Sequence, residues 1–153
     1  MGNAEHTEIR IPCDSEGFIL LKCPICGALF KLDANVLDDD SIFDIYCPEC
    51  GLVSDSYITE DVLELALIMA GNYLDDMMMN EFRKLERDTR NSPLKFKVTG
   101  NLQKEKEHPI KLTVEALERK VYRCCKKEAK IKPIIKMSGS YCPYCGVQDY
   151  GIE

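Results

Sequence analysis

Two short cysteine motifs decide how the front of this chain folds: Cys23-Pro24-Ile25-Cys26-Gly27 and, after a gap of twenty residues, Cys47-Pro48-Glu49-Cys50-Gly51. In each motif, two residues between the thiols permit a tight turn that places both sulfurs on one tetrahedral ion. The proline fixes φ, and the glycine can adopt a positive φ that turns backbone amides toward the sulfurs. The spacing therefore predicts a four-cysteine zinc site formed by Cys23, Cys26, Cys47 and Cys50.

A second group of cysteines lies near the C-terminus. Cys142-Pro143-Tyr144-Cys145-Gly146 matches the first two motifs, but sixteen residues before it stands the adjacent pair Cys124-Cys125. We expect all four to bind a second structural zinc ion: Cys124, Cys125, Cys142 and Cys145. The alternative is that one of the adjacent thiols is replaced by another group, with His108 the only histidine nearby. Cys125 is the safer ligand, because Glu128 stands where a regular motif starting at Cys125 would have its second cysteine.

These motifs resemble those of zinc ribbons, the four-cysteine type found in general transcription factors, RNA polymerase subunits and many small bacterial proteins. The resemblance covers about residues 18–56 and 122–151. It implies a three-stranded ribbon held by two cysteine turns, present twice. Because ribbons of this type contact DNA, RNA or protein, the resemblance does not define a partner.

Disulfides, thiol redox chemistry and iron binding are the alternatives to zinc for the nine cysteines. An odd number of thiols in a chain without a signal peptide argues against disulfides, and three motifs with matching Pro and Gly look structural, not thioredoxin-like. Iron in a rubredoxin-like site would use the same ligands. Cys13 lies outside both groups and is expected to be a spare thiol. We expect no catalysis, because the sites look closed and the chain has two histidines and no nucleotide-binding or protease motif.

The rest of the chain predicts a small α+β fold, in which two three-stranded zinc ribbons are joined by a central helical segment. We expect an N-terminal ribbon over residues 1–57, a helical segment over 58–92, a strand and charged linker over 93–112, and a C-terminal ribbon over 113–153. Within these, strands are expected at 17–23, 28–32, 42–47, 94–99 and 129–132, and a loop at 35–41. The helix should begin near Thr59, where apolar residues start to recur at helical spacing.

Charge is segregated along the sequence: the net charge is −8 over residues 1–57 and +8 over residues 93–137. The basic half predicts contact with nucleic acid. The residues expected to make it are Arg123, Lys126, Lys127, Lys130, Lys132 and Lys136. A solvated lysine-rich face explains the same residues equally well.

The acidic first ribbon and the methionine-rich helical segment suggest a second function, a protein adaptor. Its partner-binding residues would be Met77, Met78, Met79 and Phe82, because three adjacent methionines cannot all face one apolar stripe. The alternative is that they pack in a core. With no signal peptide and no apolar run long enough to span a bilayer, we expect a cytoplasmic protein, from a bacterial multi-component assembly, without membrane contact or a small-molecule substrate.

Overall fold

The structure, a computed structural model, describes residues 8–110 and 116–151. The chain forms two compact units. Among the described residues, unit 1 comprises 8–9 and 61–109, and unit 2 comprises 10–60, 110 and 116–151. The helical segment is therefore inserted between two sequence halves that fold together as unit 2.

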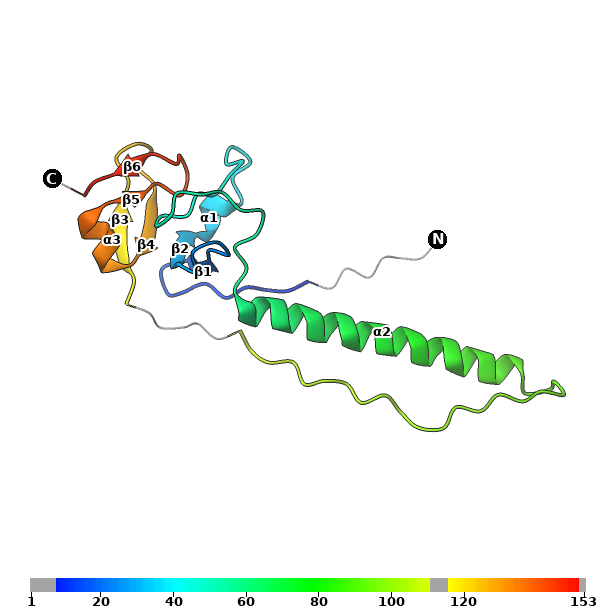
Figure 1. The fold of residues 1–153 in the computed structure, drawn as a ribbon. Helices are drawn as coiled ribbons and strands as arrows, with labels where there is room; N and C mark the ends of the chain where they lie inside the picture. The colour runs from blue at the N-terminus through cyan, green and yellow to red at the C-terminus, as the bar shows by residue number, and fades with distance from the viewer. Residues whose placement is uncertain (1–7, 111–115, 152–153) are drawn as a thin grey trace. The chain divides into compact units, whose positions relative to one another are not determined.

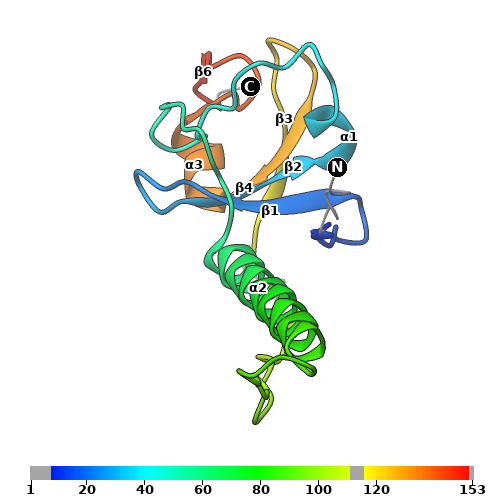
Figure 2. The same ribbon diagram turned by 90° about the vertical axis from the view of Figure 1, so that its right-hand side faces the viewer.

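Four strands of unit 2 form one antiparallel sheet, in which both halves take part (Figures 1 and 2). The strand order is β1-β2-β4-β3, with bounds Phe18–Lys22 for β1, Leu29–Asp33 for β2, Glu118–Val121 for β3 and Glu128–Ile131 for β4. Strand β2 pairs with β4, so the two cysteine-containing halves share a sheet. The expected small α+β fold class is confirmed. The two separate three-stranded ribbons that were expected do not form, because β1, β2, β4 and β3 join in one sheet.

The core of unit 2 follows from the alternation of side chains along the two central strands. Phe30 and Leu32 on β2, and Ala129 and Ile131 on β4, are at most 1% exposed, while the residues between them are less buried. A strand directs successive side chains to opposite faces, so one face of β2 and β4 supplies this core. The Tyr57 ring meets Phe30 edge-on, with ring centroids 5.7 Å apart.

Short elements complete unit 2, and they differ from the prediction in two places. Helix α1, Ala34–Leu37, begins where a loop was expected; Asp33 caps it by accepting a hydrogen bond from the Asn35 amide. The strand expected at 42–47 is reduced to a single bridge between Tyr46 and Val53. The remaining elements are α3, Pro133–Ser138, β5, Ser140–Tyr141, and β6, Gln148–Asp149. The expected start of the C-terminal ribbon near Thr113 lies outside the described residues.

The two halves of unit 2 repeat the same order of elements: strand, cysteine turn, strand, short helix and a second cysteine turn. The repeat is also visible in the sheet. Lys31, five residues after Cys26, pairs with Lys130, five residues after Cys125. Corresponding residues thus face each other where β2 meets β4, which relates the halves by an approximate twofold axis.

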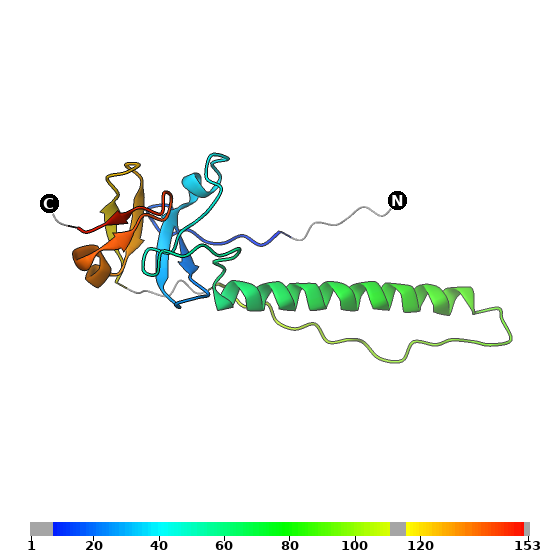
Figure 3. The same cartoon turned by 45° about the horizontal axis from the view of Figure 1, so that its top comes forward.

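Unit 1 consists of one long helix and an extended segment that returns beside it (Figure 3). Helix α2, Glu60–Asp88, is continuous through Gly71. The strand expected at 94–99 does not form; instead, the Phe96 amide donates to Thr89 Oγ1 and the Phe96 ring packs 6.1 Å from that of Phe82. Of the described helices, none is both long and apolar enough to cross a bilayer.

Candidate metal centres

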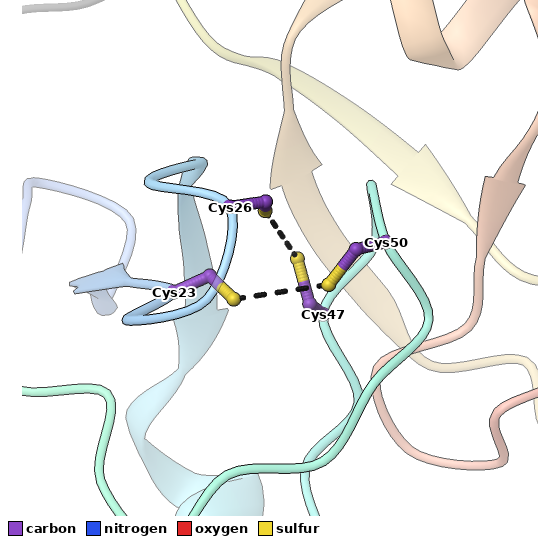
Figure 4. Close-up of side chains that lie close together, drawn as sticks. All are labelled: Cys23, Cys26, Cys47 and Cys50. Carbon is purple, nitrogen blue, oxygen red and sulfur yellow. Dashed lines mark hydrogen bonds between the residues drawn. The ribbon is translucent and has the colours of Figure 1, made fainter.

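The first candidate metal centre brings together all four cysteines predicted for it (Figure 4). Cys23 Sγ lies 3.9 Å from Cys50 Sγ, and Cys26 Sγ lies 3.5 Å from Cys47 Sγ. A tetrahedral zinc ion with Zn–S bonds of about 2.3 Å separates its sulfurs by about 3.8 Å. A disulfide requires about 2.05 Å. The arrangement therefore has the dimensions of a tetrathiolate metal site.

The second centre gathers the other four predicted cysteines. The sulfurs of Cys124, Cys125, Cys142 and Cys145 all lie within 4.8 Å of one another, and Cys125 Sγ is 3.6 Å from Cys142 Sγ. These four thiols alone supply a complete set of four ligands, so His108 is not needed as a ligand. Cys13, the ninth cysteine, is exposed and belongs to neither group.

Four turns hold these cysteines, and each is closed by the same backbone hydrogen bonds. In the turn that starts at Cys23, the Cys23 amide donates to the Ala28 carbonyl at 2.9 Å, and the Gly27 amide donates to the Cys23 carbonyl at 2.9 Å. The turns that start at Cys47 and Cys142 repeat both bonds. Backbone amides also donate to the sulfurs, for example those of Cys26 and Ile25 to Cys23. Such donors partly offset the charge of thiolates on a cation.

The fourth turn shows how the adjacent pair fits, and it corrects the register inferred from sequence. Here Tyr122 occupies the place of the first cysteine: its amide donates to the Lys127 carbonyl, and its carbonyl accepts from the Lys126 amide. Cys125 is therefore the last cysteine of this turn, whereas the sequence interpretation placed it first. Cys124 occupies the third position, where the first turn has Ile25. Lys126, with φ of 60°, stands where the other three turns have glycine.

Despite burial, hydrogen bonds lower the pKa of Cys23 and Cys125, whereas other thiols of both groups are harder to deprotonate. Burial raises the pKa of Cys47 and Cys142, both fully buried, above the ordinary value. Burial and the neighbouring thiols of Cys124 and Cys125 raise the pKa of Cys145 to about 11. Because a coordinated thiol is deprotonated outright, a divalent cation would reverse these shifts. The donor set of each group thus fits a structural metal ion.

The two centres are joined by a reciprocal contact between their C-terminal turns. The Tyr46 amide donates to the Pro143 carbonyl at 2.8 Å, and the Tyr141 amide donates to the Pro48 carbonyl at 2.9 Å. A Cβ added to Gly146 would lie 2.8 Å from the Tyr46 ring, and one added to Gly51 would lie 2.9 Å from the Tyr141 ring. Each tyrosine therefore covers the glycine of the opposite turn, so these glycines are required for close packing as well as for positive φ.

A buried ion cluster joins the halves at the approximate axis. Asp14 Oδ2 accepts hydrogen bonds from Lys31 Nζ at 3.2 Å and from Lys130 Nζ at 2.7 Å, and each of the three side chains is 13% exposed. Burial alone would raise the pKa of Asp14, but hydrogen bonds from Lys130, the Phe18 and Glu16 amides, and Lys31 lower it well below its ordinary value. Asp14 thus neutralises two like charges placed opposite each other in the sheet.

The residues predicted to bind nucleic acid mostly form ion pairs inside unit 2. Lys130 pairs with Asp14 and Glu16, Lys127 lies 3.9 Å from Asp39, and Lys132 lies 3.7 Å from Glu49. Lys136 pairs with Glu118 at 3.0 Å, and Arg123 also has an interaction partner. Lys126 is exposed in its turn. Four of the acidic partners belong to the first half of unit 2, so the segregated charges complement each other within the fold.

The predicted partner-binding residues on α2 divide between two sides of the helix. Met77 and Met78 are each 49% exposed, whereas Met79 is half-buried. Phe82, 37% exposed, contacts Phe96. The extended segment is fixed to the helix by two hydrogen bonds between Asn72 and the Glu105 backbone.

No known protein family, curated protein sequence or solved structure matches the chain. The geometry of the two cysteine groups therefore carries the functional argument, and it indicates metal binding.

Proposed function

We propose that this chain is a non-enzymatic protein held together by two structural zinc ions, whose function is to bind a protein partner. The observation that supports zinc is the grouping of eight thiols into two sets with tetrahedral spacing. Each set supplies four ligands from the chain itself, which leaves no open coordination position of the kind that catalytic zinc uses. Metal closure would also stabilise a small unit whose core is limited.

Elemental analysis of the freshly purified protein tests this metal assignment. We expect two equivalents of zinc per chain. If the protein instead contains iron and has the colour of a rubredoxin-like centre, the bound metal is iron. A well-folded protein without metal would contradict the proposal.

Helix α2 supports an adaptor function, because it carries a continuous apolar stripe that faces solvent. Its members recur at helical spacing and are each 49–66% exposed: Leu63, Leu67, Leu74, Met77 and Met78. A stripe of this size on a helix commonly marks an interaction site. The extended segment contacts the helix at Asn72 and Phe82 and borders the stripe at Leu67, which is still 66% exposed.

Charge indicates the kind of partner that fits this stripe. From Glu60 to Phe82 the helix carries six acidic side chains and neither Lys nor Arg. We infer that the stripe binds an amphipathic helix with a basic polar face, whose apolar side covers the leucines and methionines. Methionines suit such contacts because their flexible side chains adapt to the partner.

Calorimetric titration with a synthetic amphipathic helical peptide of Leu and Lys tests this inference. A peptide with Glu in place of Lys is its control, and we expect only the basic peptide to bind. Leu74→Glu and Met78→Glu should weaken binding on the order of tenfold, whereas Asn80→Glu, at an exposed position outside the stripe, should not. Equal binding of the two peptides, or of all variants, would exclude this site.

Nucleic-acid binding by the basic half stays a second prediction. It would require the ion pairs of Lys127, Lys130 and Lys132 to open, which makes it the less favoured function. Salt-titrated binding to DNA and RNA tests it, because phosphate contacts weaken steeply with salt. We also propose that the protein acts in the cytoplasm, as part of a multi-component assembly.

A further inference from the structure

The second metal centre is more exposed than the first, and the difference lies in two cysteines. In the first group, Cys26 is the exposed thiol, and Cys23 and Cys47 are buried. In the second group both Cys124 and Cys145 are exposed. Solvent-accessible thiolates are the ones that oxidants reach. The second centre therefore presents two exposed cysteines, one from each of its turns.

The position of Cys124 explains its exposure. It stands at the third place of its turn, where Ile25 of the first turn is 54% exposed, while buried Tyr122 occupies the ordinary ligand place. The Tyr122 hydroxyl lies 3.1 Å from Ser140 Oγ, and Lys120 Nζ donates to the same oxygen at 3.0 Å. This hydrogen-bonded group fixes Tyr122 in the core. Cys124 must therefore contribute its sulfur to the metal site from the outer side of the turn.

A cavity adjoins Cys124. It has a volume of about 240 Å³ and is lined by Cys124, its neighbour Arg123, and Val147, Asp149 and Tyr150 from the segment after Cys145. Since a water molecule occupies about 30 Å³ in the liquid, the cavity admits a small oxidant such as a peroxide. It does not involve any cysteine of the first group.

We propose that Cys124 is the peroxide-sensitive ligand of the second centre, and that its oxidation to a disulfide with Cys145 opens this centre while the first stays closed. This inference rests on the zinc occupancy proposed above. The Cys124 thiolate attacks one peroxide oxygen, the O–O bond breaks, and a sulfenic acid and one water form. The Cys145 thiolate then attacks the Cys124 sulfur and displaces a second water. Two thiolates, one hydrogen peroxide and two protons thus give one disulfide and two waters, and Cys125 and Cys142 remain as ligands.

The test is a hydrogen peroxide titration of the zinc-loaded full chain in the presence of a chromogenic zinc chelator. We expect one zinc equivalent to be released on the order of tenfold faster than the other. Peptide mapping by mass spectrometry at that point should find a disulfide between Cys124 and Cys145, with the cysteines of the first group unmodified. Parallel release of both equivalents, or first oxidation within the group of Cys23, would overturn the inference.

Two variants and one prior measurement sharpen this test. Cys13→Ser removes an exposed thiol outside both groups and should leave the release unchanged. Cys124→Ser should abolish the disulfide and make one zinc equivalent accessible to the chelator without peroxide. Zinc content before treatment separates the two proposals: fewer than two equivalents refutes both, whereas two equivalents released in parallel refutes only this one.

Discussion

Replacing Asp14 by asparagine should strongly destabilise unit 2, although the substitution changes almost no volume. Asparagine keeps the oxygen that accepts from the Glu16 and Phe18 amides, both at 3.0 Å. It loses the negative charge between Lys31 and Lys130. The two ammonium groups then face each other across the sheet, each on a side chain that is 13% exposed.

The expected cost follows from the burial of this cluster. Removing one partner of a fully buried ion pair costs about 3–5 kcal/mol, because the other charge is left without compensation. Here each lysine keeps slight contact with water, and Lys130 still pairs with Glu16, which is half-exposed. We therefore expect Asp14→Asn to lower the free energy of unfolding by about 2–3 kcal/mol. Adding Lys31→Met should recover part of this loss, because it removes one of the two repelling charges.

Guanidinium chloride unfolding at a fixed free zinc concentration, followed by far-ultraviolet circular dichroism, measures this effect. Glu118→Gln is the control, since its pair with Lys136 is exposed on both sides and lies outside the cluster, and an exposed ion pair contributes at most about 1 kcal/mol. The pKa of Asp14 is lowered in the fold, so its contribution is complete above its unfolded pKa of about 4 and is lost as pH falls further. The difference between wild type and Asp14→Asn should shrink in the same range. A cost for Asp14→Asn no larger than that of the control would refute this account of the cluster.

Three further predictions concern the cysteine turns. Lys126→Gly should raise the free energy of unfolding by roughly 1 kcal/mol, because Lys126 has a φ of 60° where the other turns have glycine; a loss of stability in the same denaturation assay would contradict this. Gly146→Ala should cost about 2 kcal/mol or more, because its Cβ would lie 2.8 Å from the Tyr46 ring. Gly27→Ala, with similar φ but open space around it, should cost only about 1 kcal/mol, and equal costs would argue against the contact. A strong zinc chelator should abolish the near-ultraviolet circular dichroism of the tyrosines in unit 2, and added zinc should restore it; an unchanged spectrum would show that metal does not hold the fold.

The grouping of the cysteines was predictable from sequence because the spacing within each turn is local. The register of the fourth turn was not. Tyr122 lacks a thiol, so nothing in the motif marks it as the counterpart of Cys23. The signal that could have revealed it is the match between Phe30-Lys31-Leu32, which begins four residues after Cys26, and Ala129-Lys130-Ile131, which begins four residues after Cys125.

The pairing of the strands and the role of the charges were not predictable for a common reason: both depend on residues far apart in sequence. The alternation at 94–99 is typical of a strand, but the segment has no strand beside it and instead packs Phe96 on Phe82. The basic residues suggested an external polyanion. In the fold, Lys130 and Lys132 instead meet carboxylates of the other half.

The pairing of β2 with β4 also determines the order in which the protein can assemble on the ribosome. Cys23 and Cys50 are 27 residues apart and can close early, whereas Asp14 must wait for Lys130, 116 residues later. At elongation rates of about 5–20 residues per second, β4 follows β2 after roughly 5–20 s. During that interval one edge of β2 has unpaired amide and carbonyl groups, which neighbouring nascent chains can pair with. The length of the inserted helix and its return segment thus sets how long each new chain is exposed to mispairing.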